Sequence, residues 1–200
     1  MTEDTVMRRV LPALLLLAIG LPVAAAEQTL TIDPAQTTIA FHLKATGHDV
    51  EGGFLLVDGA IRFDTETGEA GGEIRVDATR SETGNKKRDK AMHRKVLESE
   101  EYPMFVFRPE RIEGKLADNG SSSLTLEGTI SVHGEDHAFR MPVEAEVHEG
   151  RLSATTTFSI PFVDWGMKNP SFLILRVAKQ VQVTVNAEGR LTDAGSGPGL

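Results

Sequence analysis

The sequence contains no cysteine at all. This absence excludes disulfide bonds, thiolate nucleophiles, cysteine metal ligands and the acylated cysteine of a lipoprotein. A domain of this size must therefore be held together by an apolar core without covalent cross-links.

Signatures of catalysis are also missing. The chain has no G-x-S-x-G, no H-E-x-x-H and no glycine-rich phosphate loop. Asp33, Asp64 and Asp77 lie near the ends of predicted strands in different segments, and nothing marks two of them as an acid/base pair. We therefore predict no catalytic residue, no metal and no cofactor. An enzyme remains the alternative if an acid and a histidine converge inside the fold.

Long apolar runs are confined to the N-terminus. Arg8 and Arg9 precede an apolar run over residues 10–23, and Ala24–Ala26 supply small residues suited to cleavage. This order predicts a secretory signal peptide over residues 1–26, cleaved near Ala26, and a periplasmic or secreted protein. The alternative is an uncleaved anchor, but the run is shorter than the ~20 residues that span a bilayer.

Positive charge is in the minority. The chain has 29 acidic and 21 basic residues and a net charge of −8, which argues against nucleic acid as a partner. Residues 27–190 are predicted to form one domain, and the glycine-rich residues 191–200 a flexible tail. The oligomeric state is left open, and a dimer is compatible with the sequence.

What the chain does contain is the two-residue period of β-strands. Apolar residues alternate with polar ones around Ile39, Ile61, Ile74, Val143 and Val183. Glycine-bearing turns are predicted between these segments at residues 58–59, 67–68, 119–120, 133–134 and 149–150. Strands in series joined by short turns predict an all-β antiparallel meander, closed as an up-and-down barrel or folded as a sandwich.

One segment departs from this pattern. Asn85 is placed to cap a helix over residues 86–97, in which Met92 and Val96 lie one turn apart. Its other faces carry six basic residues within 86–95. One interpretation is a transient contact with an anionic membrane surface. The other is a solvated helix that covers one end of the barrel; the two are compatible.

The segment 161–170 holds the single tryptophan and is predicted to be an irregular loop, followed by a buried strand over residues 172–177. Asp164 is expected to accept hydrogen bonds within this loop. His133 and His137 flank a predicted hairpin tip, where they either hold a metal with Glu135 and Asp136 or simply decorate an exposed turn.

An ordered series of short motifs resembles the YceI-like family, the polyisoprenoid-binding proteins with a lipocalin-like barrel. The motifs include Ile32-Asp33-Pro34-Ala35, Thr83-Gly84-Asn85-Lys86-Lys87-Arg88-Asp89, Tyr102-Pro103-Met104-Phe105 and Asp164-Trp165-Gly166-Met167. The chain departs from the family pattern at Gln36-Thr37 and Met92-His93, and residues 168–171 resemble a subgroup.

The resemblance implies an exported carrier that binds a long amphiphile, a polyisoprenoid or isoprenoid quinone, inside its barrel. The inward-facing candidates for lining this cavity are apolar: Phe41, Leu43, Phe54, Phe63, Ile74, Val76, Phe105, Phe107, Ile130, Phe139, Phe158 and Phe172. Asp164, Trp165 and Asn169, with the basic helix, are the candidates for the cavity mouth. The alternative is a non-catalytic structural or interaction module whose barrel is fully packed.

Overall fold

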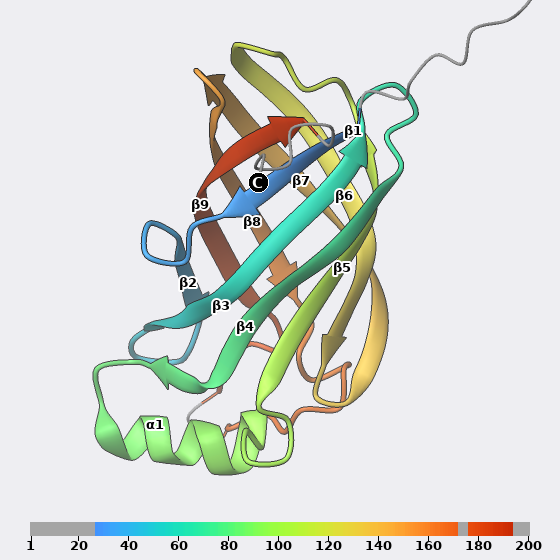
Figure 1. The fold of residues 1–200 in the computed structure, drawn as a ribbon. Coiled ribbons are helices and arrows are strands. Elements are labelled where there is room, and N and C mark those ends of the chain that lie inside the picture. The colour runs from blue at the N-terminus through green and yellow to red at the C-terminus, as the bar shows by residue number, and fades with distance from the viewer. Residues whose placement is uncertain (1–26, 172–175, 194–200) are drawn as a thin grey trace, which may run out of the picture.

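The computed structural model describes residues 27–171 and 176–193. They form a closed antiparallel β-barrel with one short helical segment (Figure 1). The strands are β1 (Glu27–Ile32), β2 (Thr38–Leu43), β3 (Val50–Asp64), β4 (Ala70–Glu82), β5 (Met104–Glu113), β6 (Gly120–Val132), β7 (Glu135–His148), β8 (Arg151–Ile160) and β9 (Val181–Asp193).

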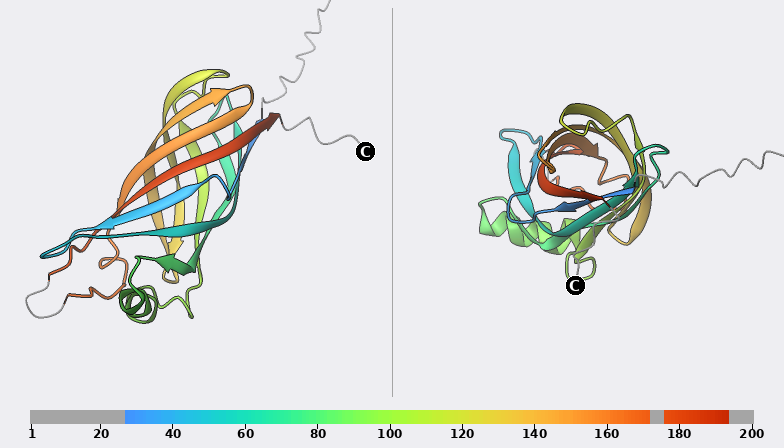
Figure 2. Two further views of the ribbon diagram at one scale, coloured as in Figure 1. Left: turned by 90° about the vertical axis from the view of Figure 1, so that its left-hand side faces the viewer. Right: turned by 45° about the horizontal axis from the view of Figure 1, so that its top comes forward.

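The first two strands share one position in the barrel wall. β1 pairs with the end of β3 around Ile61 and with the end of β9 around Leu191, whereas β2 pairs with their other halves. Nine strands therefore occupy eight positions, and every pairing between neighbours is antiparallel. The two views of Figure 2 show these strands tilted and arranged in a ring. The barrel alternative is confirmed over the sandwich.

The predicted turn at Asp58-Gly59 is wrong, because β3 runs through it without interruption. Between Leu56 and Asp58 the register with β4 shifts by one residue, which places a bulge at Val57. Before the bulge Phe54 (half-buried) and Leu56 (buried) face inward, and after it Gly59, Ile61 and Phe63 are buried, so one strand keeps its apolar side on the core throughout.

The other predicted turns lie between strands. The β6–β7 and β7–β8 hairpins each have a two-residue turn with positive φ at both positions, His133 (54°) with Gly134 (80°) and Glu149 (50°) with Gly150 (73°). Turns of this kind match the right-handed twist of the flanking strands.

The predicted helix is confirmed as α1 (Lys86–Met92), which continues into a short π-helix, η1 (His93–Leu97). The Asn85 side chain accepts hydrogen bonds from the backbone of Lys87 and Arg88, as a helix cap should. Two side chains of α1 hold Thr83 in place. The backbone amide of Thr83 donates to the carboxylate of Asp89 (2.9 Å), and its carbonyl accepts from the guanidinium of Arg88 (2.8 Å). These contacts fasten the start of α1 to the end of β4.

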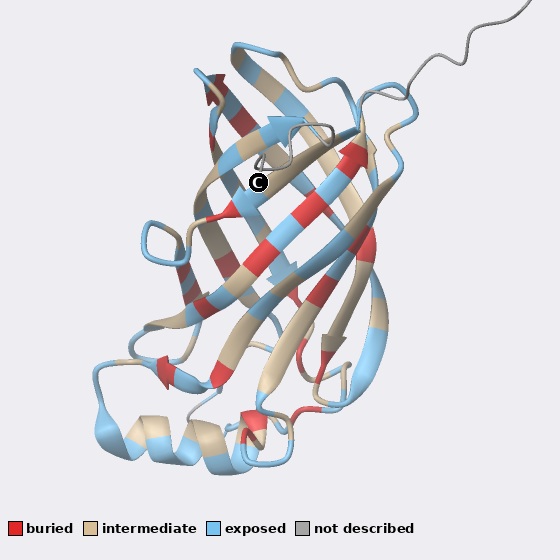
Figure 3. Ribbon diagram, in the orientation of Figure 1, coloured by how far each residue is buried: buried red, intermediate tan, exposed pale blue. Residues whose placement is uncertain are grey.

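Buried and exposed residues alternate along the strands (Figure 3). The core lies inside the barrel and includes Ile39, Phe41, Leu56, Val132, Ile160 and Val183. β9 extends to Asp193 and pairs there with β1, so residues 191–193 belong to the barrel rather than to the predicted tail. Among the described residues, no helix is long and apolar enough to cross a membrane. Residues 1–26, predicted to be a signal peptide, lie outside the described residues, as do Phe172 and most of the strand predicted over 172–177.

Candidate functional site

The barrel encloses an apolar cavity of about 1060 Å³. Its walls come from every strand, because each strand turns alternate side chains inward. Pockets that hold small molecules typically measure about 300–1,000 Å³. The interior is therefore hollow, contrary to the alternative of a fully packed barrel, and it is large enough for an elongated ligand.

Most of the predicted lining residues do face this cavity. Ten of them line it: Phe41, Leu43, Phe54, Phe63, Ile74, Val76, Phe105, Phe107, Ile130 and Phe158. Phe54 contacts both Phe41 and Phe105 with ring centroids 5.4 and 5.5 Å apart, which places an aromatic wall near the α1 end. Their contact with a ligand stays a prediction.

Phe139 does not line the cavity. It packs edge-on against Phe158 (5.1 Å between centroids) and against Trp165 (6.0 Å). Trp165 itself stacks on His137 and is likewise absent from the cavity wall. The described backbone pairing of β7 with β8 ends at Glu144 and Thr155. Beyond that point the two strands form a seam, and the rings of Phe139, Phe158, Trp165 and His137 pack there.

Of the three predicted mouth residues, only Asn169 borders the cavity. Its amide nitrogen donates to the carbonyl of Val177 at 3.3 Å, which tethers the loop after β8. Asp164 is exposed and makes no hydrogen bond with the described part of the chain, so the expectation that it accepts loop hydrogen bonds is wrong. The sequence could not separate these neighbours, because a loop carries no periodic pattern.

Residues of the helix form much of the mouth and were not predicted individually. Ala91, Met92, Val96 and Leu97 turn toward the cavity, together with basic residues of the same segment. Helical spacing in the sequence already placed Met92 and Val96 on the same side of the predicted helix. Other strand positions in the lining, such as Met141 and Val185, belong to alternations that were recognised, whereas Leu56 does not.

A polar cluster joins three elements beside this mouth. The carboxylate of Glu98, at the end of η1, accepts from Lys168 at 3.0 Å and lies 2.9 Å from His133 Nε2. Lys168 and His133 thereby hold the pKa of Glu98 below its ordinary value of 4.5. Glu98 has a positive φ of 47°, as does His133 (54°), and strained backbone of this kind persists only where the surroundings enforce it.

His93 fastens the helix from inside. Its Nε2 lies 3.0 Å from the carbonyl of Ser81, and its Nδ1 lies 3.0 Å from the hydroxyl of Ser99. Because a carbonyl can only accept, Nε2 is the nitrogen that donates. Ser81 and Ser99 are both buried, so His93 connects β4 to the segment that follows η1.

The two histidines considered as metal ligands have separate partners, His133 with Glu98 and Tyr102, and His137 with Trp165. In residues 27–171 and 176–193, no three acidic or histidine side chains are grouped as metal ligands.

The three aspartates near strand ends accept hydrogen bonds from residues close to them in the sequence. Gln36, the backbone of Thr67 and the hydroxyl of Thr79 hydrogen-bond to Asp33, Asp64 and Asp77 respectively, and these bonds lower the pKa of each carboxyl. None of the three carboxyls borders the cavity.

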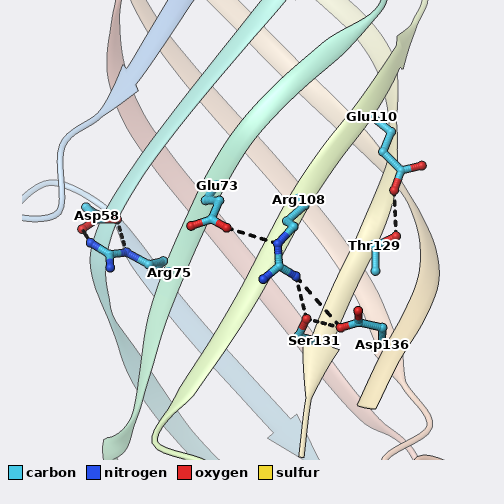
Figure 4. Close-up of polar contacts among 8 residues, drawn as sticks. All are labelled: Asp58, Glu73, Arg75, Arg108, Glu110, Thr129, Ser131 and Asp136. Carbon is cyan, nitrogen blue, oxygen red and sulfur yellow. Dashed lines mark hydrogen bonds and ion pairs between the residues drawn. The ribbon is translucent and has the colours of Figure 1, made fainter. Parts of the chain in front are cut away.

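Part of the outer face of the barrel carries a series of polar contacts (Figure 4). Across β3–β6, Arg108 contacts Glu73 (3.1 Å) and Ser131 (2.8 Å), and Arg75 pairs with Asp58. Exposed ion pairs of this kind add little to stability. These exposed polar contacts differ from the largely apolar lining of the cavity.

A family model for the YceI-like domain matches residues 30–189. The chain belongs to the YceI-like family. Solved structures in this fold include BcnA of Burkholderia cenocepacia (TM-score 0.65, 15% identity, covering 78% of this chain and 98% of that one). A polyisoprenoid binding domain from Saccharophagus degradans, implicated in plant cell wall breakdown, has a TM-score of 0.65 and 14% identity, covering 84% and 100%. The Campylobacter jejuni YceI protein has a TM-score of 0.57 and 17% identity, covering 72% and 85%.

At these identities the solved structures establish the fold alone. The comparison with curated proteins found no match. The resemblance drawn from the sequence motifs is confirmed at the level of the YceI-like family, and so is the barrel.

Proposed function

We propose that this protein is a non-catalytic carrier that binds the apolar chain of a long amphiphilic lipid, a polyisoprenoid or an isoprenoid quinone, inside its barrel. The observation that carries the proposal is the apolar cavity of about 1060 Å³. The polyisoprenoid binding described for the Saccharophagus degradans domain supports the same ligand class. Membership in the YceI-like family supports it as well.

Energetics favour reversible carriage over permanent binding. Each buried methylene contributes about 0.8 kcal/mol, so a five-carbon isoprene unit contributes roughly 4 kcal/mol relative to water. A long polyprenyl chain would soon exceed the practical limit of about 20 kcal/mol. The competing site for such a lipid is a bilayer, however, where its chain is equally well solvated. The net free energy of transfer into the barrel is therefore small, and the lipid can be released.

Catalysis is disfavoured by the cavity wall. Among the described residues that line it, His48 is the only histidine and no carboxylate is present. The acid–histidine pair that would indicate an enzyme is thus missing from the place where a substrate would lie.

The basic helix supports delivery at a membrane. Lys86, Lys87 and Lys90 are exposed on α1, beside the cavity mouth. Each basic residue near an anionic bilayer surface contributes roughly 1 kcal/mol of attraction. Replacing these three lysines by glutamine should slow lipid transfer to anionic vesicles and leave transfer to zwitterionic vesicles unchanged. Equal transfer rates for the two proteins on anionic vesicles would contradict docking through α1.

Export to the periplasm or the medium is part of the proposal. The support is the predicted signal peptide over residues 1–26. Expression of the full chain followed by cell fractionation and N-terminal sequencing tests it. A mature protein that begins near Glu27 in the exported fraction is expected, and an uncleaved cytoplasmic chain would contradict export.

Native mass spectrometry tests the carrier function directly. The protein purified without detergent should retain a lipid or take up added quinone or polyprenol. The variant Ala154→Phe adds a ring to the cavity wall and should lose most of this uptake. Ser159→Phe adds the same ring to an exposed position of β8 and is the matched control. Protein that is always empty and never takes up either lipid contradicts the proposal.

A further inference from the structure

The cavity runs along the whole length of the barrel. At one end it is bordered by Met92 and Val96 of the helical segment, and at the other by Leu116 of the loop between β5 and β6. Figure 1 shows these two elements at opposite ends of the barrel. The lysines and arginines of the described lining belong to the helical segment and to the loop after β8. The charged end of the cavity is therefore the one beside α1.

The end of the cavity near Leu116 offers only hydrocarbon. Ile112 at the end of β5, Leu124 near the start of β6 and Leu152 near the start of β8 line this end. The described residues there present no charged or hydroxyl side chain to the cavity. An amphiphile keeps its polar head in contact with water, because burying a polar group without a partner costs free energy. The apolar tip of the chain is therefore the part of the ligand that reaches Leu116.

Leu116 separates the cavity from a second pocket. This pocket, of about 320 Å³, is bordered by polar residues such as Gln28, Asp118 and Thr192. Leu116 is the one described residue that borders both spaces, and its side chain is half-buried. It therefore acts as a partition between the apolar cavity and the more polar pocket beyond it.

The loop that carries Leu116 is held in place. The amide of Ala117 donates to the hydroxyl of Ser122 at 2.9 Å, which ties the loop to the start of β6. Gly114 has a positive φ of 101°, and a Cβ there would lie 3.0 Å from the carbonyl oxygen of Ser123. The loop thus passes close to β6, and this close approach fixes the depth at which Leu116 closes the cavity.

We infer that Leu116 sets an upper limit on the length of the lipid chain that the cavity accepts. The inference rests on the proposed function and adds selection by chain length to it. A chain that ends before Leu116 is covered by the barrel, whereas a longer chain must leave its last unit in the polar pocket or in water. Each methylene group exposed in this way lowers the affinity about fourfold. The protein should therefore accept polyisoprenoids up to a limiting number of units and discriminate against longer ones.

A length series tests the inference. Zwitterionic vesicles are loaded with an equimolar mixture of all-trans polyprenols from farnesol to decaprenol, and native mass spectrometry identifies the lipids that the protein takes up. The chain is equally well solvated in the bilayer and in the cavity, so uptake should not fall with length until the limit is reached. For a chain one isoprene unit longer than the limit, uptake should fall by at least about tenfold, because the last unit loses its apolar surroundings.

Substitutions at the partition should move the limit in opposite directions. Leu116→Trp adds about as many atoms as one isoprene unit contains and should lower the limit by that unit. Leu116→Ala with Leu124→Ala removes about as many carbon atoms and should raise the limit by one unit. Asn119→Trp is the matched control, because Asn119 is exposed on the same loop and borders neither the cavity nor the second pocket. The control should keep the limit of the unaltered protein.

The outcomes separate this inference from the proposed function. Far-UV circular dichroism establishes that each variant is folded, and the alanine pair tests the limit by itself if the tryptophan variant is not. An equal shift for Asn119→Trp and Leu116→Trp, or a limit that no substitution at Leu116 moves, would overturn the inference. Uptake that does not fall over the whole series would show that the chain passes Leu116, which overturns the length limit and leaves the carrier intact. No uptake of any polyprenol would contradict the carrier and the inference together.

Discussion

Trp165 lies flat on His137, with ring planes 4° apart and centroids 4.1 Å apart. The contact joins the loop after β8 to the first half of β7, where the described pairing between these strands has ended. The seam is thus closed by side chains rather than by backbone hydrogen bonds. It follows that the single tryptophan stabilises the barrel wall, and that its ring is not part of the cavity.

Replacing Trp165 by alanine should therefore lower stability and spare ligand capacity. We expect a loss of about 2 kcal/mol in the free energy of unfolding, less than the ~3–5 kcal/mol typical of fully buried tryptophan, since Trp165 is half-buried. Urea unfolding followed by far-UV circular dichroism measures it, because the variant has no other tryptophan to report by fluorescence. Trp165→Phe should recover part of the loss. A variant of unchanged stability that fails to take up lipid would instead place Trp165 at the mouth.

His93→Ala should detach the helix from the barrel. The substitution leaves the buried carbonyl of Ser81 and hydroxyl of Ser99 without their partner, at a cost of about 2 kcal/mol. Hydrogen exchange should accelerate in α1 and η1 more than in the strands. His93→Gln, which retains a donor for the Ser81 carbonyl, should show a smaller effect. Uniform acceleration over the whole barrel would argue against a local role.

Gly128→Ala should destabilise the β5–β6 pairing. A Cβ at this position would lie 2.1 Å from the carbonyl oxygen of Arg108, next to the bulge in β5, and a backbone atom cannot move aside cheaply. We expect a cost of about 1–3 kcal/mol in a denaturant titration. Gly71→Ala is the matched control, because nothing lies within 4 Å of its Cβ. Equal effects of the two substitutions would contradict the close approach at Gly128.

The barrel could be predicted from the sequence because strand alternation identifies the inward residues one by one. Ile74 and Val76 on β4 illustrate this, as do Phe41 and Leu43 on β2. The turn wrongly predicted at Asp58-Gly59 has a physical cause. An Asp-Gly dipeptide is typical of tight turns, but here β3 continues through it, and the irregularity is a bulge at Val57 that changes which residues face inward.

The cavity and its mouth were less predictable. Apolar periodicity states which side chains point inward, but not whether they meet, so a hollow interior could not be distinguished from a packed one. Phe139 has the inward alternation and yet lies in the seam, because β7 separates from β8 there. The neighbours Asp164, Trp165 and Asn169 have three different environments, since a loop after a strand follows no period.

Acid should weaken the cluster that joins η1 to the β6–β7 turn and to the loop after β8. The pKa of Glu98 is lower in the folded protein than its ordinary value of 4.5, so the folded state binds fewer protons than the unfolded state. The contribution of Glu98 to stability is therefore fully present above pH 4.5 and is lost as the pH falls through the lower, folded value.

The test is to compare the unaltered protein with Glu98→Gln across the acidic range, by urea unfolding at each pH. The two proteins should differ most above pH 4.5 and converge at lower pH, because Glu98 is then protonated in both states. Glu100→Gln alters an exposed neighbouring carboxylate that forms no ion pair with the described residues, and it should show no such pH dependence. A constant difference between wild type and Glu98→Gln at all pH values would show that the contacts with Lys168 and His133 do not depend on the charge of Glu98.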